Sequence, residues 1–101
     1  MRLGASGLAA GFRLLAKVKV MAAHEVILYS RKGCHLCEVV KESLEGLTHR
    51  AQFTWHEVDI DQDEDLRQKY NDEVPVVFIN GRKAFKYSMD EEEFLRKLAR
   101  I

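Results

Sequence analysis

An uninterrupted apolar run, Val26–Tyr29, constrains the fold of this chain more than any other feature of its sequence. Polar residues, Glu25 and Ser30, bound the run on its two sides. A strand with one solvent-facing side alternates apolar and polar residues, whereas a continuous apolar run suits a strand that is buried on both faces. We therefore expect Val26–Tyr29 to be an interior strand of a sheet that helices cover on both faces.

A helix pattern follows this strand after a short polar loop. Over His35–Leu47, apolar residues recur at helical spacing, at Leu36, Val40, Leu44 and Leu47. Phe53–Ile60 is rich in aromatic and branched residues, which indicates a second strand. A strand, a helix and a strand in this order form a right-handed crossover, so the two strands should be parallel.

The remaining sequence predicts two helices and two strands. They are a helix capped by Asp61 or Asp63, strands over Val74–Ile79 and Lys83–Tyr87, and a last helix over Asp90–Ile101. Asn80-Gly81 is a strong hairpin signal, so these two strands should be antiparallel. The fold class is therefore α/β: a mixed four-stranded sheet in β-α-β-α-β-β-α order, with helices on both faces.

Charge divides the chain into a basic extension, residues 1–24, and a domain, residues 25–101. The extension contains four basic and no acidic residues, and the domain contains 12 basic and 16 acidic residues. The extension suits a disordered tail, with Met21 as the true first residue, or an organelle presequence. A secretory signal is disfavoured because its apolar stretch is interrupted. We expect a cytoplasmic protein, or a mitochondrial or plastid one if the extension is a presequence.

Composition limits the classes of function. The 101 residues have a formal net charge of zero, which gives no field that would attract nucleic acid. No apolar run reaches the roughly 18 residues that a membrane span needs. Two cysteines are too few for a disulfide-stapled secreted scaffold. We therefore expect a single-domain, monomeric protein that binds neither nucleic acid nor membrane.

The two cysteines, Cys34 and Cys37, lie where the first loop meets the first predicted helix. Free N–H groups and the helix dipole favour an anion at a helix N-terminus, so Cys34 should ionise more readily than an ordinary cysteine. A thiolate is the species that attacks disulfides. We assign Cys34 as the attacking thiolate and Cys37, one turn further along, as the resolving thiol. The neighbours Arg31, Lys32 and His35 add positive potential that would stabilise the thiolate.

Two other uses of the cysteine pair stay open. Cys-x-x-Cys is half of a zinc site, but a closed site needs four ligands, and His24, His49 and His56 are scattered along the chain. His35 could supply a third ligand, and a second subunit or external thiols could complete a metal or iron–sulfur carrier. We predict no metal in the chain itself. The remaining alternative is a non-catalytic adaptor whose disulfide state changes partner binding.

Two motifs resemble those of a known group. Gly33-Cys34-His35-Leu36-Cys37 after a buried strand, together with the stretch Glu73–Gly81, is similar to a glutaredoxin-like member of the thioredoxin-fold superfamily. The resemblance covers residues 26–101. It implies a thioredoxin-like fold and a thiol–disulfide oxidoreductase that acts on protein disulfides or glutathione mixed disulfides. It implies no bound cofactor, with glutathione as a co-substrate.

The same resemblance implies further roles for residues around the cysteine pair. Pro75 would be the family's cis-proline beside the cysteines, and the backbone of Val74 would pair with an extended substrate. Lys32 or Arg31 would lie near a glutathione carboxylate. The chain departs from standard glutaredoxins in having His35-Leu36 between the cysteines and no Gly-Gly turn before the last helix. The electron donor is therefore left open between glutathione and a reductase.

Overall fold

A computed structural model describes residues 24–100 of the chain. The predictions for the basic extension, apart from His24, and for Ile101 lie outside the described residues. Within residues 24–100, no helix is both long enough and apolar enough to cross a membrane.

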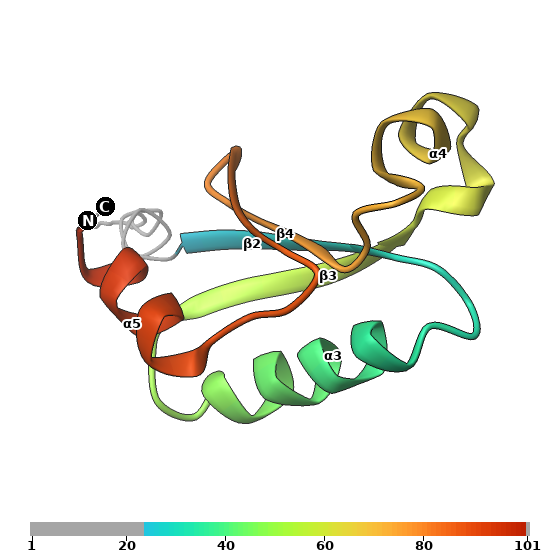
Figure 1. The fold of residues 1–101 in the computed structure, drawn as a ribbon. Helices are drawn as coiled ribbons and strands as arrows, with labels where there is room; N and C mark the ends of the chain where they lie inside the picture. The colour runs from blue at the N-terminus through green and yellow to red at the C-terminus, as the bar shows by residue number, and fades with distance from the viewer. Residues whose placement is uncertain (1–23, 101) are drawn as a thin grey trace, which may run out of the picture.

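The described chain contains four strands and three α-helices in the expected order (Figure 1). Their bounds are β2 His24–Ser30, α3 His35–Leu47, β3 Phe53–Asp59, α4 Glu64–Tyr70, β4 Val76–Ile79, β5 Arg82–Lys86 and α5 Glu91–Arg100. A short 3₁₀ turn, Ile60–Gln62, which the sequence did not reveal, precedes α4.

The strands form one mixed sheet in the order β3-β2-β4-β5. β2 is parallel to β3 and antiparallel to β4, and β4 is antiparallel to β5. The hairpin prediction is confirmed, since Asn80 and Gly81 turn the chain with positive φ angles of 51° and 82°. The prediction of a mixed four-stranded sheet is also confirmed.

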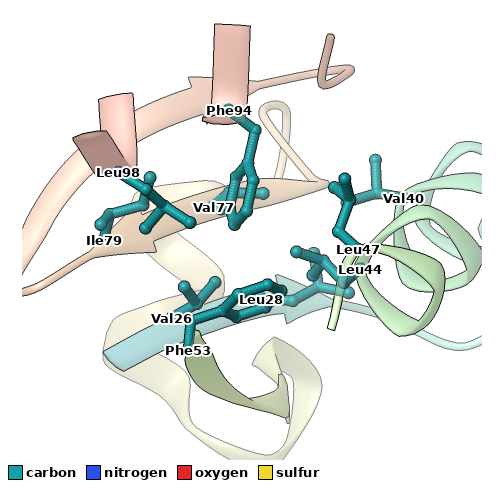
Figure 2. Close-up of a cluster of buried hydrophobic side chains, with 10 residues drawn as sticks. All are labelled: Val26, Leu28, Val40, Leu44, Leu47, Phe53, Val77, Ile79, Phe94 and Leu98. Carbon is teal, nitrogen blue, oxygen red and sulfur yellow. The ribbon is translucent and has the colours of Figure 1, made fainter. Parts of the chain in front are cut away.

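The main core lies between the sheet and the pair α3 and α5, which Figure 1 shows on the same side of the sheet. Figure 2 shows its ten buried side chains: Val26, Leu28, Val40, Leu44, Leu47, Phe53, Val77, Ile79, Phe94 and Leu98. Burial of such a continuous apolar set is the dominant force that holds the helices on the sheet.

The opposite face of the sheet is covered less completely. There Tyr29 stacks on Tyr70 of α4 with ring centroids 5.1 Å apart, and Phe78 meets Tyr29 edge-on at 5.4 Å. The expectation that β2 is buried on both faces is only partly correct, because Ile27 and Tyr29 are half-buried. The reason is that α4 has only seven residues and cannot cover the whole face. Helices nevertheless lie on both faces, as expected.

Asp63, rather than Asp61, caps α4. Its carboxylate accepts the backbone N–H groups of Asp65 at 2.9 Å and Leu66 at 3.2 Å. Asp61, which does not cap α4, instead accepts hydrogen bonds from Arg31 in the loop after β2.

Candidate active site

Cys34 is the N-cap residue of α3, as the sequence predicted. Its backbone is extended, with φ −97° and ψ 107°, and its Sγ accepts the backbone N–H of Cys37 at 3.1 Å. Gly33 lets the loop turn into the helix directly before Cys34, since its φ of +76° is one that a side chain would disfavour. The sulfur therefore lies at the positive end of a 13-residue helix, where an anion is stabilised.

Cys34 and Cys37 are joined by a disulfide, with their Cα atoms 5.2 Å apart. Cys34 is half-buried, whereas Cys37 is only 1% exposed. One sulfur of the pair is thus open to a reaction partner and the other is shielded. This asymmetry is what the division into an attacking and a resolving thiol requires.

The peptide bond between Val74 and Pro75 is cis. Val76 pairs with Tyr29 in the sheet, so one step along this register brings the buried Pro75 beside Ser30, where the loop to Cys34 begins. The N–H of Val74 donates to the carbonyl of Tyr70 at 3.2 Å. An extended substrate at this point would therefore meet the carbonyl of Val74 rather than its N–H.

Arg31 joins the cysteine loop to the segments around α4. Its guanidinium donates to both carboxylate oxygens of Asp61, at 2.7 and 3.2 Å. It also donates to the side-chain oxygen of Asn71 at 2.8 Å and to the Asn71 carbonyl at 3.2 Å. The hydrogen bonds to Arg31 hold the pKa of Asp61 below its ordinary value, and the same pair raises the pKa of Arg31.

The sequence of the chain matches the profile of one family, the Glutaredoxin-like domain (DUF836), over residues 25–99. The chain belongs to this family. The match includes residues of every described element, and together with Cys34 at the N-terminus of α3 and its buried partner Cys37 it supports a redox role in general.

Other proteins resemble this glutaredoxin-like domain in sequence or in fold. A Dictyostelium discoideum protein named as a glutaredoxin-like YDR286C homolog is 32% identical over 79 residues, covering 72% of this chain and 73% of its own. The solution structure of protein Ne2328 from Nitrosomonas europaea is 32% identical with a TM-score of 0.66, covering 74% of this chain and 91% of its own. Oxidized thioredoxin O2 from Arabidopsis thaliana, at 18% identity and a TM-score of 0.57, covers 81% of this chain and 77% of its own, and shows the thioredoxin-like fold alone.

Besides Arg31, two basic residues lie beside the cysteines in this glutaredoxin-like domain, Lys32 and His35, and both are exposed. His35 opens α3 directly after Cys34, and Lys32 lies in the loop before it. Lys32 also lines a depression of about 270 Å³ together with Ser30, Arg31, Glu38, Glu57 and Asp59. Of the three predicted basic residues, Lys32 and His35 are open to solvent, while the guanidinium of Arg31 is engaged within the domain.

The sequence did not reveal a polar cluster beneath the start of α3. Ser30, only 2% exposed, donates its hydroxyl to the carboxylate of Glu57 at 2.6 Å. Lys41 of α3 approaches the other oxygen of Glu57 at 3.4 Å, and this contact raises the pKa of Lys41. The only available signal was a polar residue at the end of an apolar strand, which does not identify a partner 27 positions away.

One expectation about the first helix is wrong. Leu36 does not belong to the buried stripe of α3, which consists of Cys37, Val40, Leu44 and Leu47; its side chain is 52% exposed. Leu36 lies only about 20° from Leu47 around the helix axis. It is exposed because it lies in the first turn, before Val40, the first residue of α3 that packs in the core cluster.

Within residues 24–100, no three His, Cys, Asp or Glu side chains are grouped to hold a metal ion.

Proposed function

We propose that this glutaredoxin-like protein is an enzyme, a thiol–disulfide oxidoreductase in which Cys34 attacks and Cys37 resolves. The observation that supports this most strongly is the environment of the Cys34 sulfur. It accepts an N–H bond at the N-terminus of α3, is reachable from solvent, and has a shielded partner within bonding reach. Each of these properties serves exchange chemistry, and together they are more than a structural disulfide would need.

The reaction starts from the reduced dithiol. The Cys34 thiolate attacks one sulfur of a substrate disulfide, forming a mixed disulfide and releasing one substrate thiolate, which takes up a proton. Cys37 then loses its proton, attacks the Cys34 sulfur and releases the second substrate thiolate. Two electrons have passed to the substrate, and the Cys34–Cys37 disulfide remains. Glutathione or another thiol reductant would restore the dithiol.

Substrate would approach along the Val74–Pro75 segment. The carbonyl of Val74 can accept an N–H from an extended substrate, as in the addition of a strand. Exposed Lys32 and His35 add positive charge near the Cys34 thiolate. Both protein disulfides and glutathione mixed disulfides are candidate substrates.

Single-cysteine variants test the proposal. Pre-reduced protein should reduce a small glutathione mixed disulfide, with turnover supported either by glutathione and its reductase or by a thioredoxin reductase. Cys34→Ser should lose this activity. Cys37→Ser should accumulate a mixed disulfide at Cys34, visible as an added mass in intact-protein mass spectrometry. Full activity in Cys34→Ser would refute the assignment.

A further inference from the structure

A groove of about 480 Å³ lies between the edge strand β5 and the last turns of α5. Within the described chain, four of its six lining residues are basic and none is acidic: Ile79, Arg82, Lys83, Ala84, Lys97 and Arg100. We refer to this feature as the basic groove. A hollow of this volume is of the size that takes a small molecule.

The two walls of the basic groove both direct cations into it. Arg82 of β5 is directly opposite Ile79, and opposed residues of an antiparallel pair point to the same face of the sheet. Ile79 is buried in the core with Leu98 of α5, so Arg82 points to the face that α5 covers. Lys97 of α5 is half-buried, and its Nζ lies 5.4 Å from the ring centroid of Phe85 on β5. Strand and helix thus supply positive charge to one hollow.

Acidic side chains neutralise this charge only in part. Lys83 pairs with Glu73, so its ammonium is engaged. The guanidinium of Arg100 reaches a glutamate two turns earlier on its own helix at 3.7 Å, which is a long contact. The ion pairs within residues 24–100 include neither Arg82 nor Lys97. Three cations of the basic groove are therefore available to a ligand.

The fold alone does not account for this gathering of charge. The dipole of α5 favours cations in its last turn, where Lys97 and Arg100 lie. These two residues are three positions apart, however, and like charges at this spacing repel. Arg82, on the facing strand, adds a third positive charge that no helix dipole favours. Their mutual repulsion is relieved when an anion lies between them.

The surroundings favour a compact anion over an extended chain. β5 is short, its pairing with β4 contains a bulge, and it carries basic residues at its edge, all of which discourage the addition of a peptide strand. Single-stranded nucleic acid needs open aromatic rings on which bases stack, but the ring of Phe85 is covered by Lys97. Guanidinium groups match the oxygen atoms of a phosphate and bind them in pairs.

We propose that the basic groove binds a small molecule that carries a diphosphate group, either free pyrophosphate or a diphosphate ester. One phosphate would accept hydrogen bonds from Arg82 on the strand, and the other from Lys97 and Arg100 on the helix. The groove lies far from the cysteine pair, because β4 begins beside the cysteine loop and ends at Ile79. Figure 1 shows the same separation, with α5 at the left and the start of α3 at the right. The inference is therefore independent of the proposed function.

Calorimetric titration of the full chain tests the proposal, with pyrophosphate, orthophosphate and ADP as the probes. Salt at about 0.1 M screens charges more than about 10 Å apart, so that short-range contacts dominate the measured affinity. We expect one pyrophosphate per chain, bound at least about tenfold more tightly than orthophosphate, because the second phosphate adds charge-assisted hydrogen bonds to the other wall. ADP that binds at least as tightly as pyrophosphate identifies an ester as the ligand, and weaker ADP binding identifies the free ion.

Variants link this binding to the two walls. Arg82→Gln with Lys97→Gln removes one cation from each wall and should weaken pyrophosphate binding at least about tenfold. Arg67→Gln with Lys69→Gln removes the same charge from α4 and should leave the affinity unchanged, so it is the matched control. Arg82→Gln alone, at an exposed position, should weaken binding about threefold and serves if the double variant does not fold. Circular dichroism establishes the folding of each variant.

Amide resonances of labelled protein locate the bound anion. At saturation, those of residues 82–84 and 97–100 should shift, whereas those of residues 34–37 should not. Three results would overturn the proposal: no saturable binding of pyrophosphate, equal losses of affinity in the two double variants, or shifts centred on Lys32 and Cys34. Each of these would leave the thiol–disulfide exchange untouched, since that activity is measured separately with the cysteine variants.

Discussion

At the scale of single residues, position rather than residue type distinguishes the two cysteines. Cys34 caps α3 and is half-buried, while Cys37, three residues later, lies on the buried side of the helix at 1% exposure. The cap bond from the N–H of Cys37 to Cys34 Sγ orients the outer sulfur at the helix dipole. In the proposed function, the same residue type serves as nucleophile in one place and as shielded thiol in the other.

Arg31 contributes at this scale by fixing one loop against another. Arg31→Lys keeps the charge but cannot reach Asp61 and Asn71 together with the planar fork of a guanidinium. We expect kcat/KM for a peptide disulfide to fall about five- to tenfold, because a small misplacement of the attacking sulfur lowers the rate strongly. Arg96→Lys is the control, since Arg96 pairs with Glu93 of its own helix. Equal kcat/KM in the two variants would contradict this role.

The Arg31–Asp61 pair also predicts a pH dependence. The pKa of Asp61 is lowered in the folded protein, so its contribution to stability is present above the ordinary carboxyl pKa of about 4 and is lost as the pH falls through the folded value. Asp61→Asn should therefore lower the Tm at pH 7, and the difference from wild type should shrink below about pH 4. Thermal unfolding followed by circular dichroism measures it. A Tm difference that does not change between pH 7 and pH 3 would show that the ion pair is not its cause.

At the scale of elements, α3 connects the core to the site. Its buried stripe runs from Cys37 to Leu47 and packs the helix on the core, and its N-terminal end carries both cysteines. The stripe fixes the rotation of α3 about its axis.

Leu44 tests the anchoring of α3. It is fully buried in the core (Figure 2), so Leu44→Ala should lower the free energy of unfolding by about 3 kcal/mol, as cavity-forming changes do. Glu42→Ala, on the exposed side of the same helix, should change it by less than about 0.5 kcal/mol. Urea denaturation measures both. Losses of the same size in the two variants would mean that the stripe does not anchor the helix.

The sequence predicted these elements well but not their long-range contacts. The order of strands and helices, the capping position of Cys34 and the hairpin at Asn80-Gly81 all follow from local signals within a few residues. The partners of Arg31 lie 30 and 40 residues away, and no local pattern specifies them. The exposure of Leu36 was missed because helical spacing gives its angle around the axis but not where along the helix the contact with the core begins.

At the scale of the whole molecule, the sheet brings together two segments that are far apart in the chain. β2 and β4 are antiparallel neighbours, so the end of β2 that leads to Cys34 lies beside the start of β4 that follows Pro75. Parallel pairing of β2 with β3 places the polar cluster of Ser30 and Glu57 at the same end. One end of the sheet thus carries the cysteine pair, the backbone of Val74 and the loops that Arg31 joins.

The central claim is that the reduced Cys34 sulfur is an activated thiolate in neutral water, and its alkylation rate tests this most directly. Fully reduced Cys37→Ser protein is treated with iodoacetamide between pH 4 and pH 10, and the rate at Cys34 is followed by mass spectrometry. We predict a midpoint at least one pH unit below the roughly 8.5 of a free cysteine. A midpoint at or above that of a free cysteine would contradict the account.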